Sequence, residues 1–208
     1  MRFGPIVSIG ETAGQPREAG DRSMSTSNLQ PVASGIQTPR VERECLSAIE
    51  QHYYYEARLL QNDQYREWLE QIVADDIHYW MPVYEQRFAR DKRSPPTPND
   101  AAVFNDDFAM LKMRVDRLYT GQVWMEDPPS RIRYLLTNIE AYHTQRDDEY
   151  QVFCNFAIHR HRRQDQHYVH VGGREDLLRR SGAGFRLARR KIILDARVVQ
   201  DKNLYFFP

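Results

Sequence analysis

Helical periodicity gives way to an aromatic strand pattern at Asp75-Asp76-Ile77-His78-Tyr79-Trp80-Met81-Pro82-Val83-Tyr84. From Ile77 to Val83, apolar side chains occupy every second position, and this period of two is typical of a strand with one buried face. Pro82 lacks a backbone donor, which favours an edge strand or a bulge. We therefore predict a strand from about residue 77 to residue 88, and we expect the two acidic residues before it to end a helix.

The composition is that of an ordinary globular protein. The chain has 208 residues, of which 41% are hydrophobic and 28% are charged, and its formal net charge is +0. A neutral chain has no global field that attracts nucleic acid or a membrane surface, and no apolar run reaches the about 20 residues of a membrane helix. Its two cysteines, Cys45 and Cys154, lie far apart and fit a reducing compartment. We expect a cytoplasmic protein without nucleic-acid or membrane partners.

The first 37 residues differ from the rest of the chain. They are rich in Gly, Ser and Pro, and Phe3 is their one aromatic residue. Such a segment buries too little apolar area to offset the entropy lost on ordering. We predict a flexible tail over residues 1–37 and a single domain over residues 38–208, and Met24 is an alternative start.

Helical periodicity follows the tail. Thr38-Pro39 is a helix-start signal, and apolar side chains then recur every three or four residues from Val41 to Leu60. A second, shorter apolar face covers 65–72, so the two helices should form a hairpin. A third helix is predicted after Asn105, which could cap it, with a buried stripe over 108–118.

From Arg131 onward the pattern changes to strands. The alternation blurs near residues 135–139, which predicts a bulge, and it is cleanest from Tyr150 to Ile158. Further strands are predicted over 166–178, interrupted by Gly172-Gly173, and over 185–199, with a phase change near Arg189, while apolar residues 204–207 should tuck against the body. Helices followed by long bulged strands predict an α+β fold. We expect a cone-shaped, strongly curved, mostly antiparallel sheet wrapped around the N-terminal helices.

The nearest approach to a metal site is the pair His159 and His161, which would point the same way on a strand, with Asp165 four residues on. His167 and His170 lie close by in the sequence. Three arginines surround the pair, at 160, 162 and 163, and their charge disfavours a dication. A polar face or an interface is the preferred interpretation, and no metal site is expected.

Asp76, His78 and Tyr79 could serve as acid–base groups inside a cone. However, Asp76 and His78 share one face of the predicted strand and Tyr79 points to the other. An ordinary strand after a helix is the simpler interpretation. Neither Gly172-Gly173 nor Gly182-Ala183-Gly184 has the spacing or the Lys of a phosphate loop, and no nucleophile motif is present.

Basic residues gather late in the chain: Arg174, Arg179, Arg180, Arg186, Arg189, Arg190 and Lys191. Few aromatic residues lie among them, which argues against nucleic acid. A docking surface for an acidic partner, or a solvated strand face, is favoured. If it is a docking surface, charge reversal at Arg189 and Arg190 should weaken assembly.

Several motifs together resemble a known family. They are Tyr54-Tyr55-Glu56-Ala57-Arg58-Leu59-Leu60, Trp68-Leu69, Asp76-Ile77-His78-Tyr79-Trp80-Met81-Pro82, Phe104-Asn105-Asp106-Asp107, Pro129-Ser130-Arg131-Ile132-Arg133-Tyr134-Leu135, Ile193-Leu194-Asp195 and Asn203-Leu204. In order and spacing they resemble the small (beta) subunit of aromatic-ring-hydroxylating (Rieske non-haem iron) dioxygenases of the biphenyl, naphthalene and phenylpropionate type. The similarity runs from about Val41 to Phe207.

The resemblance implies a cystatin-like cone, shared with nuclear transport factor 2, in an α3β3 hexamer with a large (alpha) subunit and with beta–beta contacts. It also implies that the large subunit holds a Rieske [2Fe–2S] cluster and a mononuclear iron, and cis-dihydroxylates aromatic hydrocarbons with electrons from NADH. The small subunit would be structural.

The residues agree with that division of labour. A Rieske centre needs closely spaced Cys and His ligand pairs, and neither Cys45 nor Cys154 has a His two or three residues on. We therefore expect no catalytic, cofactor-binding or metal residues in this chain. Two alternatives remain open: a stand-alone cone-fold isomerase or dehydratase that uses Asp76, His78 or Tyr79, and a cone that binds a small ligand without catalysis.

Overall fold

The computed structural model describes residues 39–83, 88, 90–121, 128–196, 199, 201 and 204–208. The predicted tail over residues 1–37 and the alternative start at Met24 lie outside the described residues. The described elements are α1 (Arg43–Gln61), α2 (Tyr65–Gln71), β1 (Val73–Pro82), β2 (Ala102–Asp106), α3 (Phe108–Leu118), β3 (Arg131–His143), β4 (Glu149–Arg162), β5 (Gln166–Ser181) and β6 (Gly184–Leu194).

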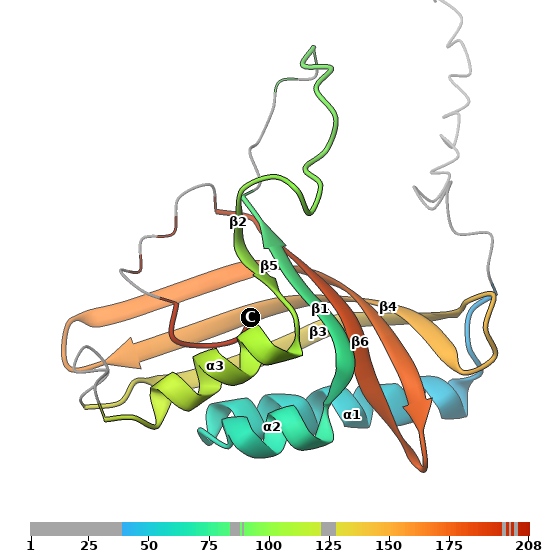
Figure 1. Ribbon diagram of the computed structural model, residues 1–208, viewed down its shortest axis with the longest axis horizontal. Coiled ribbons are helices and arrows are strands. Elements are labelled where there is room, and N and C mark those ends of the chain that lie inside the picture. The colour runs from blue at the N-terminus through green and yellow to red at the C-terminus, as the bar shows by residue number, and fades with distance from the viewer. Residues whose placement is uncertain are drawn as a thin grey trace, which may run out of the picture. The chain divides into compact units, whose positions relative to one another are not determined.

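The strands form one six-stranded sheet in the order β2-β1-β6-β5-β4-β3. β1 and β6 are parallel, and every other neighbouring pair is antiparallel. In Figure 1 the sheet curves over α1 and α2, which lie against the same side of it. The predicted α+β class and the curved, mostly antiparallel sheet around N-terminal helices are confirmed.

Two irregularities bend the long strands, and both were predicted. The β3–β4 register shifts between Thr137 and Glu140, where Asn138 has φ 53°. The β5–β6 register shifts between Leu177 and Leu178, opposite the segment that ends at Arg189. An extra residue in one strand raises the local twist. These two bulges therefore help the sheet to curl.

The core lies between the curled sheet and α1. Apolar residues of α1 fill it, and Tyr53 and Leu60 are fully buried. The predicted alternation in β4 is confirmed, because Val152, Phe156 and Ile158 are buried there. The predicted burial of the C-terminal residues is also confirmed, with Phe206 and Phe207 inside the core.

Two predicted boundaries in the first half of the chain were wrong. α1 begins at Arg43 and not at Thr38-Pro39. The backbone ahead of it pairs with the end of β3 instead, since the His143 amide donates to the Pro39 carbonyl at 3.0 Å. The acidic pair at 75 and 76 does not end a helix but lies inside β1, because pairing with β6 already starts at Val73.

β2 was missed by the sequence prediction. Asn105 lies in that strand, and Asp107 caps α3 by accepting a hydrogen bond from the Met110 amide at 2.9 Å. β6 ends at Leu194, before the predicted residue 199.

Gly172 was predicted to interrupt β5, but this prediction was wrong, because Gly172 lies inside the continuous strand and allows a close approach of β6. A Cβ atom at this position would lie 2.2 Å from the Ile193 carbonyl oxygen of β6. Glycine is therefore needed here for strand pairing rather than for a turn. Separately, no helix among the described residues is long and apolar enough to cross a membrane.

Candidate functional site

The three residues considered as acid–base groups do not form a site. Asp76 is exposed and accepts two hydrogen bonds from Arg179, both at 3.0 Å. His78 lies beside Asn105, with 2.9 Å between Nε2 and Oδ1. Tyr79 is fully buried and points to the opposite face, as the strand period predicted. The structure therefore separates Tyr79 from the other two residues.

The histidine pair lies on the side of the sheet away from α1. His159 and His161 of β4 flank His167 of β5, with ring centroids 6.0 Å and 5.8 Å from it. His170 is not part of this group, because it is buried. Among the described residues, no group of three or more His, Cys, Asp or Glu side chains could hold a metal ion. The described residues thus fit neither a Rieske centre nor a mononuclear iron.

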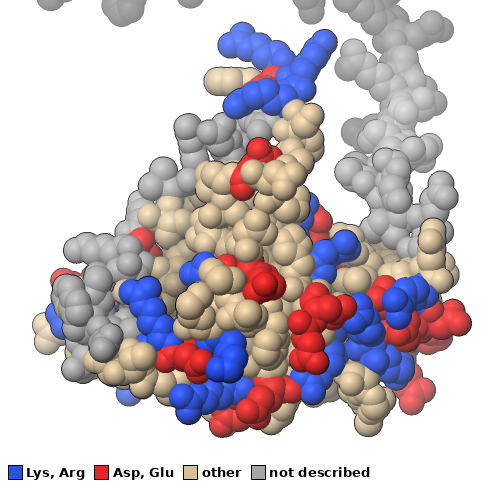
Figure 2. Space-filling model, in the orientation of Figure 1, with Lys and Arg blue, Asp and Glu red and all other residues tan. Residues whose placement is uncertain are grey.

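The predicted basic surface is partly wrong. Arg174 and Arg190 are only 2% and 1% exposed, because both side chains point into the core. Arg189 remains exposed and donates to Gln151 at 3.2 Å. On the face shown in Figure 2, basic and acidic side chains are interspersed rather than gathered by sign. The late basic residues therefore do not form one continuous patch on that face.

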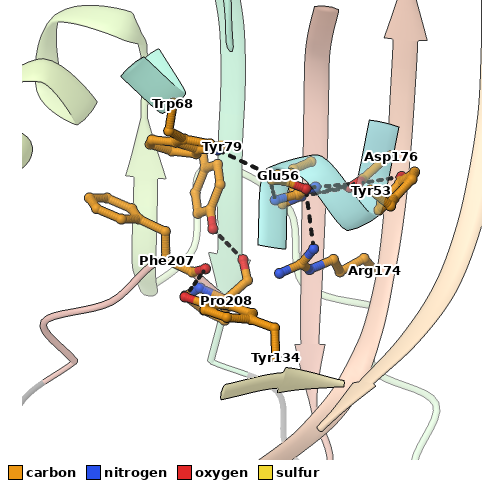
Figure 3. Close-up of polar contacts among 10 residues, drawn as sticks. Tyr53, Glu56, Trp68, Tyr79, Tyr134, Arg174, Asp176, Phe207 and Pro208 are labelled. Atoms are coloured by element: carbon orange, nitrogen blue, oxygen red, sulfur yellow. Dashed lines mark hydrogen bonds and ion pairs between the residues drawn. The ribbon is translucent and has the colours of Figure 1, made fainter. Parts of the chain in front are cut away.

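The interior instead contains a buried ionic cluster, which we define as Glu56 of α1, Arg174 and Asp176 of β5, and Arg190 of β6 (Figure 3). Arg190 donates to both oxygens of Glu56, at 2.7 Å and 2.9 Å. It also donates to Asp176, at 2.7 Å from Nη2 and 3.0 Å from Nε. Arg174 is the outlying member, 3.5 Å from Glu56. The four formal charges sum to zero.

Burial and charge oppose each other in this cluster. Burial favours the neutral form of Glu56, but the guanidinium groups of Arg190 and Arg174 outweigh it and lower its pKa from 4.5 to about 2. Burial likewise works against the charge of Arg190, and Asp176 and Glu56 raise its pKa nonetheless. Glu56 and Arg190 therefore stay ionised at neutral pH.

Two neutral donors complete the cluster. The Tyr53 hydroxyl donates to Asp176 at 2.7 Å, and the Trp68 indole donates to Glu56 at 3.0 Å. Burial and the nearby Asp176 carboxylate raise the pKa of Tyr53. Both carboxylates are thus saturated with hydrogen bonds. Neither carboxylate is therefore placed to take a proton from a substrate. The hydrogen bonds of the cluster instead connect α1, α2 and the sheet.

The C-terminal residues fill the rest of the interior. The Phe207 ring stacks on Trp68 with ring centroids 4.8 Å apart. The Tyr134 hydroxyl donates to the Phe207 carbonyl at 3.0 Å, and the Tyr79 hydroxyl donates to the Pro208 oxygen. Figure 3 shows these backbone oxygens between the two tyrosines, on the side of the interior away from Asp176.

A buried ion pair fixes the segment just before these residues. Arg160 donates to both oxygens of Asp201, at 2.7 Å and 2.8 Å, and both side chains are buried. The Phe206 ring lies against His170, with centroids 5.0 Å apart. Both hydrogen bonds come from Nη1 of Arg160, and hydrogen bonds between two charged groups are stronger than neutral ones. The C-terminal segment is therefore anchored before it enters the core.

Sequence reasoning missed the ionic cluster, although a signal for it exists. Glu56 lies on the helical face of Tyr53 and Leu60, which predicts an inward position. Arg174 and Asp176 lie in phase with buried Leu178. Charged residues are rarely buried, so the sequence prediction did not place these three side chains in the core despite their periodicity.

The comparisons with known proteins agree with this fold. A family model described as ring hydroxylating beta subunit matches residues 55–201. The beta subunit of benzene 1,2-dioxygenase from Pseudomonas putida is 36% identical over 170 residues, which cover 80% of this chain and 90% of that subunit. This chain belongs to the ring-hydroxylating beta subunit family. The family predicted from the sequence motifs is thereby confirmed.

Two further similar proteins are a biphenyl 2,3-dioxygenase subunit and a naphthalene 1,2-dioxygenase. The beta subunit of biphenyl 2,3-dioxygenase from Rhodococcus jostii is 36% identical over 162 residues, covering 76% of this chain and 86% of that one. A structure of naphthalene 1,2-dioxygenase with indole bound in the active site superimposes with a TM-score of 0.73 at 29% identity. That match covers 82% of this chain and 90% of the other.

Proposed function

We propose that this chain is the structural, non-catalytic beta subunit of the terminal oxygenase of an aromatic-ring-hydroxylating dioxygenase. The observation that carries the proposal is the family match over residues 55–201. The interior supports it, because the ionic cluster and the C-terminal residues Phe206 and Phe207 occupy the core between the sheet and the helices. The proposed reaction is cis-dihydroxylation of an aromatic hydrocarbon by the partner.

The large (alpha) subunit would hold the Rieske [2Fe–2S] cluster and the mononuclear iron and receive electrons that originate from NADH. We propose an α3β3 hexamer in the cytoplasm, with beta–beta contacts and without nucleic-acid or membrane partners. The domain over 38–208 would carry all of these contacts, and the segment over 1–37 would be a tail.

An apolar surface on the sheet supports a partner contact. Leu135, Val169 and Val171 are 51%, 46% and 45% exposed. They are close in the sheet, because Leu135 and Val171 both pair with Ala157 of β4. Exposed apolar patches commonly mark interfaces. We place part of the subunit contact there, instead of on the late basic residues.

Co-expression with a large subunit tests the proposal. We expect the chain to co-elute with the large subunit on size exclusion, and dihydroxylation to require that subunit. Val171→Glu should lower the co-eluting fraction, whereas Val83→Glu, at an equally exposed valine outside the patch, should not. Turnover by the chain alone would favour the stand-alone isomerase or dehydratase instead.

A further inference from the structure

The C-terminal residues lie in the core in the manner of a bound ligand. Segment 204–208 belongs to no strand or helix, yet Phe206 and Phe207 are 1% and 3% exposed. The Phe207 ring contacts aromatic rings from three different elements: it stacks on Trp68 of α2, and Tyr79 of β1 and Phe104 of β2 lie 6.4 Å and 6.3 Å away by ring centroid. The fold thus provides an aromatic slot that is built entirely from other parts of the chain.

The polar end of the slot is equally well defined. Two buried hydroxyls, on Tyr79 and Tyr134, donate to successive backbone oxygens of the segment. These tyrosines come from strands far apart in the sheet order, since β3 is one edge strand and β1 lies next to the other edge, and they converge because the sheet curls. Burial of a hydroxyl without an acceptor is destabilising. The slot therefore requires an acceptor at this point, whichever molecule supplies it.

Arg174 adds donors to the same region. Among the described residues, its Nε and Nη2 atoms have no hydrogen-bond partner, although the residue is only 2% exposed. Figure 3 shows the guanidinium extending from the ionic cluster toward Tyr134 and Pro208. Its charge acts on both tyrosines, since it opposes the rise in their pKa that burial causes. A second acceptor oxygen would satisfy donors that are buried and unpaired.

A cavity borders the segment on its other side. It has a volume of about 420 Å³, and its lining includes Phe104, Arg114 and Arg117 together with Phe206 and Phe207. Its size suits a small molecule. A ligand that enters there would meet the aromatic slot once the segment moves aside.

We propose that residues 206–208 act as a built-in ligand of a latent pocket, and that the vacated pocket binds a small aromatic ring bearing a carboxylate or amide oxygen. The ring replaces Phe207 against Trp68. The oxygen accepts from Tyr79 and Tyr134, and a carboxylate also engages Arg174. In the closed state the segment excludes such molecules, because ring and acceptor positions are both filled.

Binding of three matched probes to the full chain and to two variants tests this proposal. The probes are 4-fluorobenzoate, 4-fluorobenzamide and fluorobenzene, followed by ¹⁹F NMR. A chain that ends at Tyr205 vacates the ring and the acceptor positions together. We expect it to bind the benzoate and the benzamide at least tenfold more tightly than fluorobenzene, and at least tenfold more tightly than the full chain does.

The second variant separates the two parts of the pocket. Phe207→Ala in the full chain opens the ring position but leaves the backbone oxygens on the tyrosines. It should bind fluorobenzene at least tenfold more tightly than the wild-type chain, without preference for the carboxylate. Phe185→Ala is the control, because it removes another buried ring outside the proposed pocket. This variant should show no preference among the three probes, and its residues 206–208 should stay in the core.

The outcomes are decisive. If the chain ending at Tyr205 binds all three probes equally, the pocket is an ordinary apolar cavity and the proposal is wrong. If that variant does not fold, Phe207→Ala decides, because failure to gain fluorobenzene binding overturns the proposal. Equal binding of 4-fluorobenzoate by the wild-type chain and the truncated chain would show that the segment does not close the pocket.

Discussion

The ionic cluster makes a sharp prediction about Glu56. Glu56→Gln keeps the shape of the side chain but removes its charge. One carboxylate oxygen becomes an NH₂ group, which then faces either the Arg190 donor at 2.7 Å or the one at 2.9 Å. The Trp68 indole donates at 3.0 Å to the oxygen that also accepts at 2.7 Å, so a single amide oxygen can serve only one side. We expect strong destabilisation.

Two independent estimates give the same magnitude. Glu56 has a pKa lowered from 4.5 to about 2, which corresponds to about 3 kcal/mol of stabilisation of the charged form. Removal of one partner from a buried ion pair typically costs about 3–5 kcal/mol, because the remaining charge is left uncompensated. We therefore predict a loss of about 3–4 kcal/mol in the free energy of unfolding.

Urea denaturation of the full chain, followed by tryptophan fluorescence, measures this loss, and Trp68 reports from the cluster itself. Glu44→Gln is the matched control, since Glu44 is an exposed residue in the first turn of α1, and it should cost under about 1 kcal/mol. Glu56→Gln combined with Arg174→Met restores charge balance, so its cost should fall below the sum of the single costs. A loss under about 1 kcal/mol for Glu56→Gln would show that the buried charge of Glu56 does not stabilise the fold to this extent.

Four further predictions follow from the same structure. As pH falls from about 4.5 toward 2, the stability that ionised Glu56 contributes should disappear, because a lowered pKa stabilises the fold only above the unfolded value, and urea titrations at stepped pH will show this. Gly172→Ala should destabilise by more than about 2 kcal/mol, measured by thermal unfolding, because its Cβ would meet the backbone of β6. Arg190→Glu should prevent folding while Arg189→Glu leaves the circular dichroism spectrum unchanged, because only Arg190 is buried. Cys154, whose pKa burial raises to about 12, should react with a disulfide reagent only after unfolding.

Matched controls accompany these tests. Gly184→Ala places a Cβ where nothing lies within 4 Å, so it should be nearly neutral. Glu56→Gln should flatten the acid-dependent part of the stability profile. Cys45 is only partly buried and should react before Cys154 in the folded chain. Equal labelling rates for the two thiols would contradict the burial of Cys154.

Much of the fold was readable from local patterns. Period-two alternation located β4 because its neighbours bury one face, and slips of phase near 139 and 189 located the bulges. The start of α1 was mispredicted because Thr38-Pro39 is a valid local signal that pairing with β3 overrides. β2 was missed because it is only five residues long, which is too short for a clear alternation, and it is defined by its pairing with β1.

The site was harder to predict than the fold. Arg190 follows a bulge, so its inward position cannot be counted from Phe185 by simple alternation. The convergence of Tyr79 and Tyr134 on the C-terminal residues depends on the curl of the whole sheet. Local periodicity contains no information on contacts between residues that are far apart in the sequence. The family motifs, in contrast, located the subunit class directly.

The most direct test of the structural-subunit account is native mass spectrometry of the chain co-expressed with a large subunit, combined with iron analysis of the separated chains. The expected result is a complex with three copies of each subunit, all iron in the large subunit, and no iron in this chain. Iron retained by this chain together with turnover in the absence of the large subunit would contradict it.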